Sequence, residues 1–144
     1  MPIFAVMNLD LNGPKLRFVV DGCVQETSPS YEINTPELVK KYWNEHIKSD
    51  PTVEEHKEHL IVIIVNTNLK VIGYTVVSTG TVDKCLACVR NILQPVLISG
   101  AKSFLLLHNH PSGKTCPSSA DRLTTLKVKE AAELMERLFQ AFLT

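Results

Sequence analysis

The run Leu60-Ile61-Val62-Ile63-Ile64-Val65 constrains the fold of this chain more than any other segment. An uninterrupted apolar run of this length, rich in β-branched residues, is typical of a strand that is buried on both faces of its sheet. Such a sheet needs a layer of helices against each face. In a chain of 144 residues, the size of one domain, the run therefore predicts an α/β fold built around one core.

Cap and periodicity signals place the other expected elements. Thr35-Pro36-Glu37 combines a capping residue, a proline suited to the first helical turn and an acid near the helix's positive end. The remaining signals are apolar positions at helical spacing and short apolar runs bounded by turn residues. We expect helices over 36–47, 83–99 and from about Ala120 to Leu138 or beyond, and strands over 60–65, 71–78 and 103–107. This order predicts a three-layer mixed β-sheet with helices on both faces.

Residues 1–31 are expected to form an N-terminal β-hairpin extension. Two short apolar runs, Ile3–Leu9 and Leu16–Val20, are separated by the turn signal Asn12-Gly13-Pro14. The main domain is then expected to occupy residues 32–144.

Composition excludes several classes of function. Lys and Arg together number 15, as do Asp and Glu, so the chain lacks the basic excess on which nonspecific nucleic-acid binding depends. No stretch approaches the length of a membrane helix, and the first residues lack the basic start of a signal peptide. Four cysteines are too few for a disulfide scaffold. We expect a cytoplasmic protein with no membrane segment.

The stretch from His108 to Asp121 carries the chemistry. His108 and His110 are separated by one residue, so both side chains point to the same side of an extended chain where a buried strand ends. Asp121, at the start of the following helix, can reach back as a third ligand. Zinc with three His and Asp ligands keeps a fourth position for water, as catalytic sites do. The alternative is a surface loop followed by an ordinary acid in the first helical turn.

The spacing of this stretch resembles a known signature. His-x-His, seven residues, Ser118, two residues and Asp121 match the pattern of the JAMM (MPN+) metalloproteases, and the wording HNHPSG followed by PSSAD resembles the RadC branch of that superfamily. The resemblance covers roughly residues 32–138 and implies a JAMM and cytidine-deaminase-like fold with one Zn²⁺ held by His108, His110 and Asp121. Further matches are Gly80-Thr81, Arg90 and Ala101.

The resemblance also implies two catalytic residues. The family needs a glutamate ahead of the buried strand as general base and then acid, a position that Glu58 matches, with Glu55 as the alternative. If neither acts, the acidic residues before the strand are a solvated connector. Ser118 resembles the serine whose hydroxyl stabilises the oxyanion, although Ser118 or Ser119 is also suited to capping the last helix.

Two features lie outside the signature or depart from it. Cys85 and Cys88 form a C-x-x-C, which on a helix is more typical of two core positions than of a zinc or redox site, and Cys116 lies in the site loop. The family's usual Pro-Arg-Glu reads Val89-Arg90-Asn91 here. RadC-like chains also continue past the last helix into a further strand, which we expect this chain to lack, leaving a sheet edge open to homodimer formation.

The sequence therefore predicts a zinc-dependent hydrolase of the JAMM type that cleaves an amide or isopeptide bond in a protein or peptide substrate. The alternative is a non-catalytic or DNA-repair-associated binding module with the same fold. The two differ in whether Glu58 lies close enough to the metal ligands to move a proton.

Overall fold

The computed structural model describes residues 5–8, 17–20, 25–26, 31–80, 88–113, 116–135 and 138–143, of which 5–8, 17–20, 25–26 and 138–143 are described by their strand pairing. The strands β1 (Ala5–Asn8) and β2 (Arg17–Val20) pair antiparallel in a two-stranded sheet of their own, as the predicted N-terminal hairpin requires.

The main sheet is mixed. Its strand order is β3-β5-β4-β6-β7, with β4 antiparallel to both β5 and β6, and β6 parallel to β7. The central position of β4 agrees with the apolar run from which the fold was predicted. The strands are β3 (Gln25–Glu26), β4 (Glu58–Val65), β5 (Val71–Gly80), β6 (Ser103–His108) and β7 (Leu138–Leu143).

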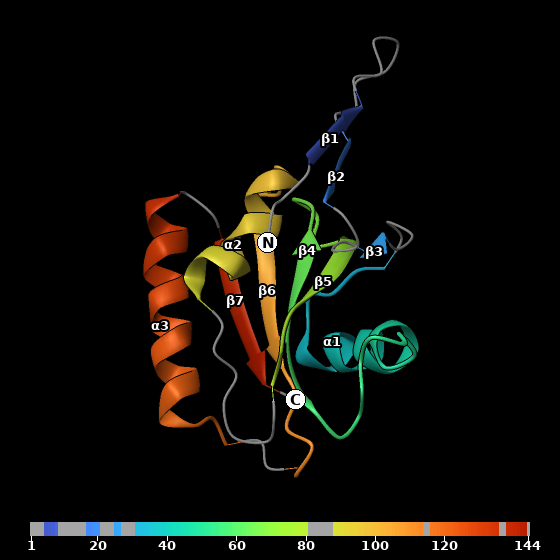
Figure 1. The fold of residues 1–144 in the computed structure, drawn as a ribbon, viewed down its shortest axis with the longest axis vertical. Helices are drawn as coiled ribbons and strands as arrows, with labels where there is room; N and C mark the ends of the chain where they lie inside the picture. Colours follow the sequence, from blue (N-terminus) through green and yellow to red (C-terminus); the bar gives the residue numbers. More distant parts are fainter. Residues whose placement is uncertain are drawn as a thin grey trace.

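Helices cover both faces of this sheet (Figure 1). One face packs against α1 (Pro36–Tyr42) and the π-helical turn η1 (Trp43–Ile47), which continues it. The other packs against α2 (Val89–Ile98) and α3 (Ser119–Leu134). The predicted three-layer α/β fold is thereby confirmed. None of the helices in the described ranges combines the length and apolar character needed to cross a membrane.

Strand β4 supplies both cores because its side chains alternate. Ile61, Ile63 and Val65 pack with α1 and η1, whereas Leu60, Val62 and Ile64 pack with α2 and α3. All six are at most 5% exposed, which confirms a strand buried on both faces. Each fully buried aliphatic side chain contributes about 1.5–3 kcal/mol of transfer free energy, so this strand anchors the whole domain.

The helix α1 begins where its sequence predicted. Thr35 is the N-cap, its hydroxyl accepts a hydrogen bond from the Leu38 amide at 3.4 Å, and Pro36 opens the helix. The chain that leads from η1 toward β4 is tied to the sheet by Tyr74, whose hydroxyl donates to the Asp50 carboxylate at 2.7 Å. This contact fixes the path of the connector that ends at Glu58.

The C-terminal prediction was wrong. The last helix ends at Leu134, not at Leu138 or beyond, and Leu138–Leu143 form strand β7, which pairs along the whole of β6. The expected open edge at β6 is therefore covered. Strand pairing outweighs helical periodicity here because it satisfies the backbone groups that β6 would otherwise leave exposed.

The middle helix is shorter than predicted. Of the expected 83–99 segment, the structure describes α2 from Val89, with Cys88 as an exposed N-cap in an extended conformation. The interpretation of Cys88 as a core residue was wrong, because a residue before the first helical turn does not share the buried face. Cys85 lies outside the described residues. Cys116 is exposed.

Candidate metal centre

The ends of two neighbouring strands bring the predicted residues together. Strand β4 begins at Glu58, β6 ends at His108, and the antiparallel register pairs Leu60 with His108. Glu58 lies two residues before Leu60, and His110 lies two residues after His108, so strand alternation directs all three toward the α2–α3 side. One ligand atom from each of Glu58, His108 and His110 can be chosen such that all three lie within 4.8 Å of one another.

The contacts within this group are at ion-pair distances. Glu58 Oε1 lies 3.4 Å from His110 Nδ1, and Glu58 Oε2 lies 3.8 Å from His108 Nε2. The side chains of these three residues are only 6–14% exposed. The glutamate therefore spans the two imidazoles in a place from which most water is excluded.

Asp121 approaches the same group from α3. Its Oδ1 lies 4.0 Å from His108 Nε2, while its Oδ2 accepts hydrogen bonds from the Ser118 amide at 2.8 Å and the Ser118 hydroxyl at 2.7 Å. Ser118 Oγ in turn accepts from the Asp121 amide at 3.1 Å, which completes a capping box. One oxygen of Asp121 thus serves the helix and the other faces the histidines.

Electrostatics favour ligand-ready forms of these side chains. Burial lowers the pKa of His108, and the nearby Asp121 and Glu58 carboxylates oppose this shift without reversing it. Burial acts to raise the pKa of Asp121, but the hydrogen bonds from Ser118 and the charges of the two histidines outweigh it, so that this pKa is lowered. A neutral imidazole and an ionised carboxylate are the forms that bind zinc.

The arrangement of His108, His110 and Asp121 is suited to binding a zinc ion. The His110 Nε2 atom is buried and has no hydrogen-bond partner among the described residues, which is costly unless something else binds it. Two ligand atoms on a tetrahedral zinc ion, each about 2.0–2.1 Å from it, lie about 3.3 Å apart. The predicted ligand atoms His108 Nε2 and Asp121 Oδ1 lie 4.0 Å apart, somewhat more than that value.

Comparison with known proteins agrees with this geometry. A family model described as the RadC-like JAB domain matches residues 33–139. The chain belongs to this family. The match begins in front of α1 and extends into β7, so it includes the central strands and every residue of the candidate site.

Curated relatives of this RadC-like JAB domain carry the name UPF0758 protein. One from Haemophilus influenzae (strain PittEE) is 34% identical over 112 residues, covering 78% of this chain and 48% of that protein. One from Streptococcus gordonii is 40% identical over 79 residues, covering 55% and 35%. One from Chlorobaculum parvum is 36% identical over 83 residues, covering 58% and 37%. The chain spans less than half the length of these relatives.

The structure brings together the residues that the sequence singled out, but not all at equal distance from one another. The tightest cluster in the JAB domain consists of Glu58, His108 and His110, and Asp121 lies at its border. Glu55, the alternative base, is 70% exposed and forms a 2.9 Å ion pair with Lys48. Of the two glutamates, Glu58 is the one beside the histidines.

Ser118 is the N-cap of α3, which confirms its predicted capping role. Its hydroxyl accepts a hydrogen bond from the Asp121 amide and donates one to the Asp121 carboxylate. Its role at an oxyanion stays a prediction.

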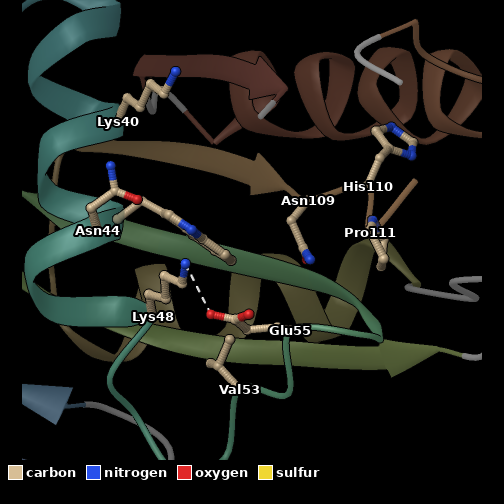
Figure 2. A pocket seen from close by; sticks show the side chains of 9 residues that line it. Lys40, Asn44, Lys48, Val53, Glu55, Asn109, His110 and Pro111 are labelled. Atoms are coloured by element: carbon tan, nitrogen blue, oxygen red, sulfur yellow. Dashed lines mark ion pairs between the residues drawn. The ribbon is translucent and has the colours of Figure 1, made fainter. Parts of the chain in front are cut away.

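A hollow of about 300 Å³ lies on the α1 side of the site loop. Lys40, Asn44, Lys48, Glu55 and Pro111 are among its lining residues, and Figure 2 shows the Lys48–Glu55 ion pair within it. His110 borders this hollow, but its imidazole points away from it in Figure 2. The hollow therefore lies beside the candidate metal centre, on the side away from the His110 imidazole.

Two polar residues at the site were missed by the sequence reasoning. Asn109, between the two histidines, is 9% exposed, and His59, next to Glu58, is fully buried. His59 Nδ1 lies 3.0 Å from Thr79 Oγ1, and its Nε2 lies 2.9 Å from the Glu54 carbonyl oxygen, so it fastens the connector before β4. The sequence contained one signal for them. His59 follows Glu58, and Asn109 lies between the two histidines, so strand alternation directs both side chains to the opposite face of the sheet.

Proposed function

We propose that this RadC-like JAB domain is a zinc-dependent hydrolase that cleaves an amide or isopeptide bond in a protein or peptide. The observation that carries the proposal is the convergence of a carboxylate and two imidazoles at the ends of β4 and β6, with Asp121 beside them. Its exposed thiols, Cys88 and Cys116, suit a reducing cytoplasmic location.

His108, His110 and Asp121 would hold the zinc ion, leaving Glu58 outside the ligand set. Two hydrogen bonds from Ser118 fix the Asp121 carboxylate and leave Oδ1 directed at His108, as expected of a ligand held by its surroundings. Among the described residues, the Glu58 carboxylate faces His108 and His110. A bound zinc ion supplies Lewis acidity, which polarises a carbonyl and brings the pKa of water to about 7.

Glu58 would move the proton. Its carboxylate accepts a proton from the attacking water and delivers it to the leaving nitrogen, which departs as a neutral amine. The low exposure of its side chain strengthens its interactions with developing charge. Ser118 acts chiefly by orienting Asp121, and its hydroxyl reaches a substrate oxygen only by giving up Asp121 Oδ2.

The first test is metal content by mass spectrometry on protein purified without added metal. We expect about one zinc per chain in the wild type and in Glu58→Gln, and loss of zinc in His110→Ala. His56→Ala is the matched control, because that imidazole is 76% exposed and pairs with Glu54, not with the members of the cluster. No zinc in the wild type after dialysis against zinc would overturn the proposal. Loss of zinc in Glu58→Gln would make Glu58 a ligand and not the base.

The second test is hydrolysis. Zinc-loaded protein is incubated with a pool of fluorogenic peptides and lysine-isopeptide-linked dipeptides, with Glu58→Gln as the inactive control. Cleavage by the wild type alone supports the hydrolase. Equal rates in both proteins would assign the cleavage to a contaminant and favour a binding module.

A further inference from the structure

The residue between the two histidines has no part in holding a metal. Strand alternation turns Asn109 to the α1 side, and Figure 2 shows its side chain directed away from the imidazole of His110. Its burial calls for hydrogen-bond partners, since a buried amide without them is destabilising.

Those partners are the residues on either side of Glu58. Asn109 Oδ1 accepts from the His59 amide at 2.7 Å, and Asn109 Nδ2 donates to the Lys57 carbonyl oxygen at 3.0 Å. The Asn109 amide also donates to the His59 carbonyl oxygen at 3.3 Å. The backbone partners, one donor and one acceptor, fix which end of the side-chain amide is oxygen and which is nitrogen.

These bonds extend the link between the two strands past the point where regular pairing ends. The β4–β6 ladder stops at Leu60 and His108, two residues after Glu58 along β4. Strand β5 holds the other edge of β4 and pairs Glu58 with Gly80, but β5 carries neither histidine. The hydrogen bonds of Asn109 tie the backbone at residues 57 and 59 to the chain that follows β6.

We propose that Asn109 is a positioning residue that sets the Glu58 carboxylate against the His108–His110 pair. The inference rests on the proposed function, because it assigns Asn109 an effect on proton transfer through Glu58. An alanine at this position removes both side-chain bonds and lets the start of β4 move relative to β6. A displacement of about 1 Å in a catalytic group is sufficient for a loss of about 100-fold in rate.

The test compares Asn109→Ala with Asn66→Ala. Asn66 is a matched control at the other end of β4, where its Oδ1 accepts from the Asn68 and Lys70 amides at 2.9 and 3.0 Å. In zinc-loaded protein we expect Asn109→Ala to keep about one zinc per chain, to lower kcat about 10- to 100-fold and to leave KM within about threefold. Asn66→Ala should leave both constants near those of the wild type.

A double-mutant cycle separates positioning from a general loss of structure. If Asn109 acts through Glu58, then adding Asn109→Ala to Glu58→Gln costs nothing further in kcat. A full multiplicative loss in the double variant, or an equal loss in Asn66→Ala, would overturn the proposal.

Hydrogen exchange on the metal-free protein gives a readout that is independent of activity. The His59 amide should exchange at least about tenfold faster in Asn109→Ala, while the Ile63 amide in the middle of β4 keeps its protection. Unchanged exchange at His59 would show that Asn109 holds nothing there. This result stands even if the protein binds no zinc, so failure of the hydrolase proposal is distinguishable from failure of this one.

Asn109→Asp covers the case in which the alanine variant does not fold. It keeps the acceptor for the His59 amide and loses the donor to the Lys57 carbonyl oxygen. As for Asn109→Ala, we expect the variant to retain zinc and to have a reduced kcat. A kcat equal to that of the wild type would overturn the proposal.

Discussion

Glu58 Oε1 lies 3.4 Å from His110 Nδ1, although the two residues are 52 positions apart in the chain. The antiparallel register of β4 and β6 creates this proximity, because the strand that begins at Glu58 lies beside the strand that runs into the histidines. Under the proposed function, Glu58 in this position would carry the proton while the metal ion would supply the Lewis acid.

Replacing Glu58 with Gln should lower kcat by about 100- to 10,000-fold, because general acid–base catalysis contributes on that scale. Zinc content should stay at the wild-type value, since the amide keeps the size of the side chain. Steady-state kinetics beside metal analysis on the same preparation measures both. A Glu58→Gln variant that retains more than a tenth of the wild-type kcat would remove Glu58 from the mechanism.

Ser118→Ala should weaken zinc binding about 10- to 100-fold, because the partners that orient a metal ligand typically contribute that much to affinity. Asp121→Asn should weaken it more, since it removes the ligand charge as well. Competition against a chromogenic chelator measures both affinities. Equal, wild-type affinity in the two variants would show that the ligand set excludes Asp121.

Zinc should stabilise the folded protein by mass action. At a free concentration 100 times Kd, the gain is about 2.7 kcal/mol, which for a domain of this size corresponds to a rise in Tm of roughly 5–15 °C. A chelator should reverse the rise. Differential scanning fluorimetry checks this, with His56→Ala expected to behave like the wild type and His110→Ala expected to show little response; a full response in His110→Ala would place the bound zinc elsewhere.

The Tyr74–Asp50 contact predicts a pH-dependent stability outside the metal centre. Burial acts to raise the pKa of Asp50, but hydrogen bonds from Thr52 and Tyr74 outweigh it and lower this pKa. The ionised carboxylate therefore stabilises the fold at pH values above its ordinary pKa of 3.8, and this stability is lost as the pH falls through the folded-state value.

Tyr74→Phe should accordingly lower the free energy of unfolding by about 1–2 kcal/mol near pH 7, and the deficit should shrink as the pH falls below about 4. Urea unfolding of the metal-free protein at several pH values measures the difference. Tyr31→Phe is the control, since that hydroxyl donates to the exposed Glu45. A deficit that stays constant with pH would show that the ionisation of Asp50 is not involved.

The sequence was sufficient for the features that depend on neighbouring residues. The run from Leu60 to Val65 predicted a strand buried on both faces, and His-x-His after an apolar strand predicted two imidazoles on one side. The resemblance placed Glu58 ahead of that strand. Each of these expectations concerns residues within a few positions of one another, or a spacing that the family shares.

Features that depend on the pairing of distant segments were not predicted. Asn109 bonds to residues 57 and 59, about fifty positions earlier, and only the register of β4 against β6 brings them together. The end of α3 was misplaced for the same reason, since its following residues gain more by pairing with β6 than by extending the helix. The exposed position of Cys88 follows from where α2 begins, which periodicity did not locate.

The two oxygens of Asp121 have a consequence for judging related sequences. Because Oδ2 belongs to the capping box of α3, selection for a stable helix alone is enough to preserve an aspartate at this position. A descendant that has lost its metal can therefore keep the acid and look intact. The Nε2 atom of His110 has no comparable structural bond among the described residues, whereas its Nδ1 faces Glu58. Under the proposed function, loss of that histidine, and not of the aspartate, is therefore the better sign that a related domain no longer binds a metal.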